Sequence, residues 1–205
     1  MVAQYAFVVN SDACSGCKTC QVACKDKHDI PVGLHWRRVY EVTAGGWQQE
    51  GAAWISSVSA YNLSVSCNHC MKAVCLVPCS SHAIWQREDG IVLIDESFCN
   101  GCRACEHACP YDMIRYDAAS HTIAKCNFCV DYLDMGLPPA CVAACPNRAL
   151  DYGDYGELRK KYGDVGRVFP LPEPAISQPA LIIIPHRNAA AAQERNPEVS
   201  NWEEL

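Results

Sequence analysis

Sixteen cysteines carry the chemistry that this 205-residue sequence can do, and they fall into four groups of four. Two groups share the spacing C-x2-C-x2-C-x3-C, namely Cys14, Cys17, Cys20 and Cys24, and Cys99, Cys102, Cys105 and Cys109. The other two have wider gaps, namely Cys67, Cys70, Cys75 and Cys79, and Cys126, Cys129, Cys141 and Cys145. In such a run, three closely spaced thiolates bind one iron–sulfur cubane and the fourth points to another. The sequence therefore predicts an electron carrier with four [4Fe-4S] clusters.

Three other uses of cysteine are weaker alternatives. Disulfides suit small secreted chains, but Met1–Asn10 has neither a basic segment nor a long apolar one, so we expect no export signal. Zinc could be held by the last group alone, but the crowded triplets of the two regular groups favour clusters. Haem attachment is excluded because histidine follows no C-x-x-C pair. With sixteen thiolates available, His69 and His107 are expected beside the clusters or on the surface.

Composition excludes several functional classes. The formal charge is -6 before any cluster is counted, which argues against a nucleic-acid partner. The longest aliphatic stretch, Leu181–Ile184, is far shorter than the roughly 20 apolar residues of a membrane span. Any membrane link is expected through another subunit. The sequence also contains no nucleophile–base pair and no phosphate-binding or dinucleotide motif, so we expect the protein itself to transform no substrate.

The elements that must position the cysteines include an internal repeat. Val9-Asn10 stands before the first regular group as Ile94-Asp95 stands before the second, and each is expected to end a short strand. Gly16 and Gly101 lie inside the ligand loops and are expected to have left-handed backbone angles, which bring amide N–H groups towards the clusters. The repeat predicts a duplicated ferredoxin unit.

Further elements are expected around these units. A β-hairpin is predicted from Trp36–Val42 and Ala53–Val65, with its turn at Gly45-Gly46. A second hairpin is predicted over 114–124, and a short helix over Gly156–Tyr162. From Pro170 onward, prolines exclude long helices and favour an extended arm. The alanine run 189–192 and the polar end 193–205 form a tail that is either disordered or lies on a partner.

The fold class is thus predicted to be α+β, with two ferredoxin-like lobes of two clusters each. The first lobe is expected over 1–35 and 118–153, and the second over 67–117. The β-hairpin insertion occupies 36–66. The helix and extended C-terminal arm, 154–205, are expected to make subunit contacts.

Several motifs extend beyond the cysteines. They include Cys14-Ser-Gly-Cys-Lys-Thr-Cys-Gln-Val-Ala-Cys24, Leu63-Ser-Val-Ser-Cys-Asn-His-Cys70 and Cys99-Asn-Gly-Cys-Arg-Ala-Cys105. With these motifs the sequence resembles the iron–sulfur subunits of membrane-bound dimethyl sulfoxide reductases over nearly its whole length. It departs at Ser80, where the family pattern usually has proline directly after cysteine.

The resemblance implies a ligand set for each cluster, in which the fourth cysteine comes from the paired run. The implied sets are Cys14, Cys17, Cys20 and Cys145; Cys126, Cys129, Cys141 and Cys24; Cys67, Cys70, Cys75 and Cys109; and Cys99, Cys102, Cys105 and Cys79. In related nitrate reductases a tryptophan at the position of Cys102 leaves a three-iron cluster. The cysteine here favours a complete cubane.

The resemblance also implies partners. These are a molybdopterin-containing catalytic subunit and an integral membrane anchor that oxidises menaquinol. The protein would be peripheral on the cytoplasmic membrane, either on the periplasmic side, by co-export with a twin-arginine partner, or on the cytoplasmic face. Polysulfide, thiosulfate, selenate, arsenate and nitrate reductases and formate dehydrogenases use similar subunits, so the terminal acceptor stays open. The alternatives of another class are a stand-alone polyferredoxin and a zinc-binding structural module.

Overall fold

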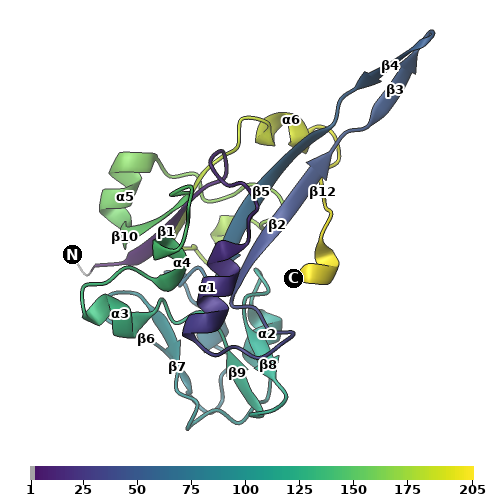
Figure 1. Ribbon diagram of the computed structural model, residues 1–205. Coiled ribbons are helices and arrows are strands. Elements are labelled where there is room, and N and C mark those ends of the chain that lie inside the picture. Colours follow the sequence, from purple (N-terminus) through teal and green to yellow (C-terminus); the bar gives the residue numbers. More distant parts are fainter. Residues whose placement is uncertain (1–2) are drawn as a thin grey trace.

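The computed structural model describes residues 3–205, which form a mixed α/β fold of small sheets and short helices (Figure 1). The strands are β1 (Tyr5–Asn10), β2 (Arg37–Ala44), β3 (Trp47–Glu50), β4 (Ala53–Ser56), β5 (Ser59–Ser66), β6 (Ile84–Gln86), β7 (Val92–Ile94), β8 (Arg115–Asp117), β9 (Thr122–Ala124), β10 (Leu150–Asp154), β11 (Leu181–Ile184) and β12 (Glu198–Val199). The α-helices are α1 (Thr19–Lys27), α2 (Ala104–Ala108), α3 (Val130–Asp134), α4 (Ala140–Ala143), α5 (Tyr155–Tyr162) and α6 (Ala189–Gln193). Short 3₁₀ turns occupy Val74–Leu76, Pro174–Ile176 and Trp202–Glu204.

Strand β1 lies in the middle of a three-stranded sheet. It pairs antiparallel with β10 on one side and parallel with β11 on the other. Its four central residues are all buried, because the core packs on one face and α5 covers the other. The strand expected before the first regular cysteine group is confirmed, as is β7 before the second.

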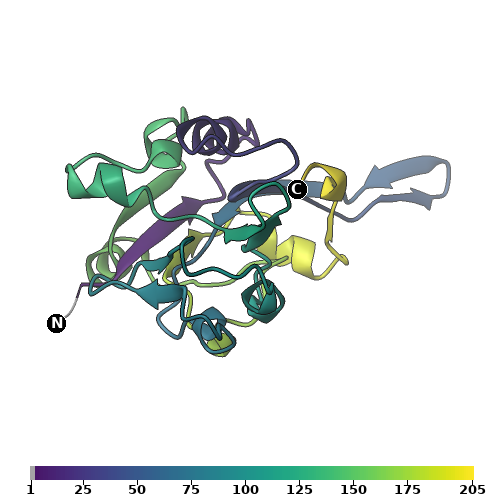
Figure 2. The ribbon, with the colours of Figure 1, turned by 90° about the horizontal axis from the view of Figure 1, so that it is seen from below.

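The predicted hairpin insertion is present, but its turn is not at Gly45-Gly46. Strand β2 pairs with β5 along eight residues, and the ribbon continues as β3 and β4 to a two-residue turn at Gly51-Ala52. Gly45 lies instead where β2 gives way to β3, with its backbone pressed against the Ser57 carbonyl. A side chain would collide there, so this glycine permits a close approach of the two halves of the ribbon and does not form its turn. Both views show the β3–β4 end projecting from the body (Figures 1 and 2).

The segment after α5 folds back over the body. It supplies β11 to the first sheet, and α6 packs on the β2–β5 ribbon. Strand β12 then pairs with β2, at Glu198 with Thr43 and Val199 with Val42. The C-terminal segment, for which disorder and partner contact were both open, thus has ordered contacts within the protein. As expected from its prolines, it contains no long helix.

Two smaller predictions are confirmed. The hairpin expected over 114–124 is β8 paired with β9. The helix expected over Gly156–Tyr162 is α5, which starts one residue earlier because the Asp154 carboxylate accepts a hydrogen bond from the Glu157 amide at 3.0 Å. It ends at Gly163, which has a left-handed φ of 85°.

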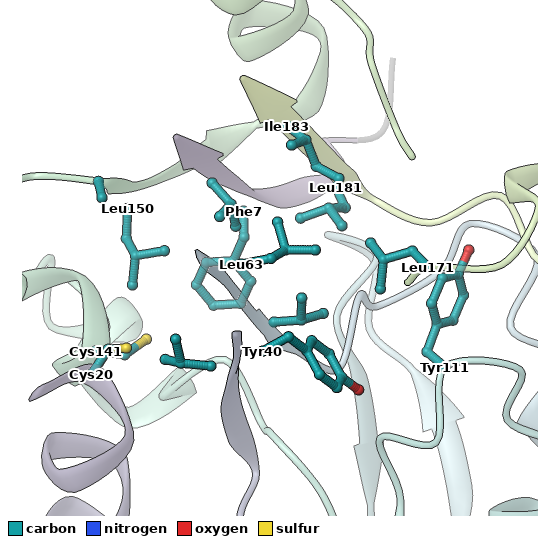
Figure 3. Close-up of a cluster of buried hydrophobic side chains, with 14 of the residues drawn as sticks. Phe7, Cys20, Tyr40, Leu63, Tyr111, Cys141, Leu150, Leu171, Leu181 and Ile183 are labelled. Atoms are coloured by element: carbon teal, nitrogen blue, oxygen red, sulfur yellow. The ribbon is translucent and has the colours of Figure 1, made fainter. Parts of the chain in front are cut away.

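The main core packs the β1 sheet and the β2–β5 ribbon against the cysteine-bearing loops (Figure 3). Phe7 of β1 stacks on Phe128, with ring centroids 4.1 Å apart. Leu63, Leu181 and Ile183 belong to the same cluster as this pair, and Cys20 and Cys141 lie at one edge of it. The thiols are therefore part of the core and are held by its packing.

Candidate iron–sulfur centres

Cys14, Cys17, Cys20 and Cys145 line one pocket, which we call the first thiol pocket. It encloses about 360 Å³ of space between atoms, part of it open to solvent. Helix α1 and the loop before it supply three of the cysteines, while the loop between α4 and β10 supplies the fourth. Val9, Val39 and Leu150 make the floor apolar. Three cysteines of one run and the last of another thus surround a single space.

A second thiol pocket repeats this arrangement with Cys67, Cys70, Cys75 and Cys109. It encloses about 370 Å³ and is walled by Val92, Met113 and Ile114. Again three cysteines come from one run and the fourth from a run further along the sequence.

A third group consists of Cys24, Cys126, Cys129 and Cys141, all buried. Helices α1 and α4 pack together and bring Cys24 and Cys141 into the same region. Burial raises the pKa of Cys24, and the charges of Cys126, Cys141 and Cys129 raise it further. The packing of α1 on α4 thus gathers cysteines of two runs in one buried region.

A fourth group consists of Cys79, Cys99, Cys102 and Cys105. Cys79, Cys99 and Cys105 belong to one packed cluster beside α2 and the turn at Val74–Leu76, which also includes Cys75 and Cys109 of the second thiol pocket. Burial raises the pKa of Cys105 to about 11, with smaller contributions from Cys79 and Cys102. Cys102 is exposed.

The buried thiols at these sites need a positive centre to become thiolates. Burial is the main reason that the pKa values of Cys70, Cys75 and Cys126 are raised to about 12. An iron core supplies the charge that holds such groups deprotonated. Backbone N–H groups also face the sulfurs, from Phe128 to Cys126 at 3.4 Å and from Ala149 to Cys145 at 3.3 Å. Buried thiols with amide donors around an open space fit an iron–sulfur cluster.

The spacing of these thiols does not favour zinc. Four thiolates on one zinc ion lie about 3.8 Å apart, because each Zn–S bond is about 2.3 Å long. Among residues 3–205, no three His, Cys, Asp or Glu side chains converge closely enough to hold a single metal ion.

The two histidines within the cysteine groups differ in their surroundings. His69 is 1 % exposed, and its Nδ1 accepts a hydrogen bond from the Val92 amide at 3.1 Å. Burial, together with the nearby charge of Lys125, holds its pKa well below the usual range, so the ring is neutral. His107 is exposed on α2. These positions agree with the expectation that they lie beside the cysteines or on the surface.

Three buried cations were not anticipated from the sequence. Arg37 and Arg38 are each 2 % exposed, and Lys125 is 4 % exposed. The Lys125 ammonium donates to the carbonyls of Val92 and Cys126. Burial alone would lower the pKa of Arg37, but negative charge on Cys141, Cys20, Cys126 and Cys24 raises it. A basic residue at the start of a strand gives no signal in sequence that it points inward.

Both predicted loop glycines have left-handed backbone angles, with φ of 73° at Gly16 and 67° at Gly101. At Gly101 an added Cβ would also collide with the His121 carbonyl oxygen. We therefore expect Gly101→Ala to distort the loop between Cys99 and Cys102 and to lose one cluster, about four irons per protein. Iron and acid-labile sulfide per protein measure this loss.

Gly136 provides the matched control, because its φ is 75° and nothing lies within 4 Å of an added Cβ. Gly136→Ala should cost about 1 kcal/mol of stability and leave the iron content unchanged. Equal iron loss in both variants would show that backbone strain alone, not this loop, controls assembly.

Comparison with known proteins agrees with this geometry. Residues 58–155 match the family described as a 4Fe-4S dicluster domain. Over all 205 residues, and the whole length of both proteins, the sequence is 42% identical to the B subunit of the anaerobic dimethyl sulfoxide reductase of Escherichia coli. The protein belongs to the family of dimethyl sulfoxide reductase iron–sulfur subunits.

Two further relatives extend the comparison. The B subunit of the anaerobic dimethyl sulfoxide reductase of Haemophilus influenzae is 41% identical over 98% of this protein and 99% of its own length. The B subunit of the polysulfide reductase of Wolinella succinogenes is 32% identical over 91% of this protein and 97% of its own length. As a member of the dimethyl sulfoxide reductase iron–sulfur subunit family, the protein carries [4Fe-4S] clusters and serves electron transfer. Within residues 3–205, none of the helices is both long and apolar enough to cross a bilayer.

Proposed function

We propose that the protein holds four [4Fe-4S] clusters, each bound by three cysteines of one run and the last cysteine of another. The observation that carries this proposal is the pair of thiol pockets, each lined by four cysteines in that combination. The proposed ligand sets are Cys14, Cys17, Cys20 and Cys145; Cys24, Cys126, Cys129 and Cys141; Cys67, Cys70, Cys75 and Cys109; and Cys79, Cys99, Cys102 and Cys105.

These sets fall into two ferredoxin-like lobes, 1–35 with 118–153 and 67–117, with the β8–β9 hairpin at their boundary. Backbone angles support the repeat. Lys18 and Arg103 occupy the same place in the two regular runs, and both have left-handed angles, with φ of 59° and 62°. The third residue after the last cysteine is also left-handed in three runs, at His82, Asp112 and Arg148. The insertion (36–66) and the C-terminal segment (154–205) then join the lobes and meet partner subunits.

A [4Fe-4S] cluster accepts and returns one electron without making or breaking a bond to substrate. The side chains of this subunit hold each site, keep water from the apolar floors and direct amide N–H groups at the sulfurs. Cys17 and Cys102 are exposed, one in the first thiol pocket and one in the fourth group. We propose that electrons pass to and from partner subunits at these two exposed cysteines.

The partners follow from the relatives, which are named as subunits of dimethyl sulfoxide and polysulfide reductases. We propose a complex with a molybdopterin-containing catalytic subunit and a membrane anchor that oxidises quinol, peripheral to the cytoplasmic membrane. Dimethyl sulfoxide is the proposed terminal acceptor, supported by full-length identity to the B subunit of such an enzyme. The catalytic subunit would select it, since the described cysteine sites offer no place for a substrate.

Anaerobically purified protein should contain about sixteen irons and about sixteen acid-labile sulfides per molecule. The EPR spectrum after full reduction should contain magnetically coupled signals of reduced cubanes. About eight irons and eight sulfides would instead indicate two clusters. Zinc with little sulfide, in material never exposed to oxygen, would contradict it entirely.

A further inference from the structure

Arg37 is a buried cation whose hydrogen-bond partners in the described part of the protein are all neutral. Its guanidinium donates to the Ser64 hydroxyl at 3.2 Å and to the Ser66 hydroxyl at 2.9 Å. The side chain lies over the Phe7 ring, 4.7 Å from its centroid, and within residues 3–205 its Nε has no partner.

The neighbouring Arg38 shows the usual arrangement. It is as buried as Arg37, but its guanidinium pairs with the Asp112 carboxylate at 3.3 Å. Leaving a buried charge without an opposite charge is strongly destabilising. The absence of such a carboxylate beside Arg37, among the residues that the structure describes, therefore requires another source of negative charge.

The candidates are cysteines of two proposed ligand sets, because Phe7, which Arg37 covers, packs in one cluster with Cys20, Cys126 and Cys141. Cys20 belongs to the first thiol pocket, while Cys24, Cys126 and Cys141 belong to the third group, and the charges of all four act on Arg37. The Ser64 hydroxyl lies between the guanidinium and Cys20, 3.3 Å from the sulfur. Because Arg37 occupies one side of this hydroxyl as donor, the Ser64 proton is free to point at Cys20.

Four thiolates and a core of about +2 leave a net charge of about -2 at each site before reduction. We propose that Arg37 is the shared counter-charge of the two centres of the first lobe, raising the reduction potentials of both. This inference rests on the proposed ligand sets. In the dry interior between these sites, Arg37 stabilises the additional negative charge of the reduced state more than that of the oxidised state. The Ser64 hydroxyl also donates a hydrogen bond to the Cys20 sulfur of the first thiol pocket.

The test is a potentiometric EPR titration of the full-length protein, purified anaerobically with its clusters and bound partners, with dithionite supplying the electrons. Arg37→Met removes the charge and keeps much of the volume. Two of the midpoint potentials should move to lower values. Arg37→Lys should restore most of that shift, because it keeps the charge, and Arg38→Met should leave the same two potentials unchanged.

Two variants assign the EPR signals to the two centres. Cys17→Ser removes the signal of the first thiol pocket, and Cys129→Ser removes the signal of the third group. Unchanged potentials in an Arg37→Met protein with full iron content would overturn the inference. If that variant does not retain iron, Arg37→Gln decides, because it removes the charge but keeps an amide that can donate to Ser64 and Ser66. Lower potentials at both centres support the inference, and unchanged ones overturn it. Wild-type protein without cluster signals would instead refute the proposed function.

Discussion

Replacing Cys145 by serine is expected to remove the same EPR signal as replacing Cys17, although the two residues lie far apart in the sequence. Both line the first thiol pocket, so each substitution removes a ligand from one centre. Iron should fall from about sixteen per molecule in either variant, by about one atom if a three-iron cluster remains and by about four if the centre is lost. The double variant should lose no more than a single variant loses, because both changes act on the same centre.

The matched control is Cys24, which follows Cys17 and Cys20 in the same run but faces Cys126 and Cys141. Cys24→Ser should remove a different signal, the one that Cys129→Ser removes. If Cys24→Ser and Cys17→Ser remove the same signal, each run binds its own cluster and the crossed assignment is wrong.

Removal of iron by an anaerobic chelator is expected to unfold the cysteine-bearing segments of both proposed lobes. Helices α2, α3 and α4 have only four or five residues, far fewer than an isolated helix needs to persist in water. The free energy of cluster binding is thus folding free energy for these segments. Amide hydrogen exchange before and after chelation measures the effect. Protection in α1 and α4 should fall by several orders of magnitude.

The β2–β5 ribbon serves as an internal reference, because it contains no cysteine and has eight residue pairs. Its amides should keep more protection than those of α4 after chelation. Equal protection of α4 with and without iron would show that packing alone maintains the fold. The clusters would then bind to a structure that is already folded without them.

The cysteine-bearing parts of the fold could be predicted because local sequence determines them. The strand before each regular run, the glycines at positive φ and the β8–β9 hairpin all follow from neighbouring residues. The grouping of the cysteines was available only through the family resemblance, since spacing alone does not tell which distant fourth thiol completes a site. The two pockets bring together the combinations that the resemblance implied.

Long-range features were less accessible. Two adjacent glycines usually indicate a turn, but Gly45 is needed for close contact with Ser57, a partner that only the strand register reveals. The short apolar run that forms β11 could pair with any strand edge, and its parallel partner β1 lies at the opposite end of the sequence. The inward direction of Arg37 likewise depends on the register of β2 against β5.

The position of β1 constrains how the protein is made. Its parallel neighbour β11 (Leu181–Ile184) is separated from it by most of the described sequence and is synthesised long after it. The sheet cannot be completed until β11 has left the ribosome, and non-local pairings of this kind form slowly. The cysteines of α1 and of the loop before it are synthesised within that interval. We therefore expect an interval in which these thiols are accessible to iron before β11 completes the sheet.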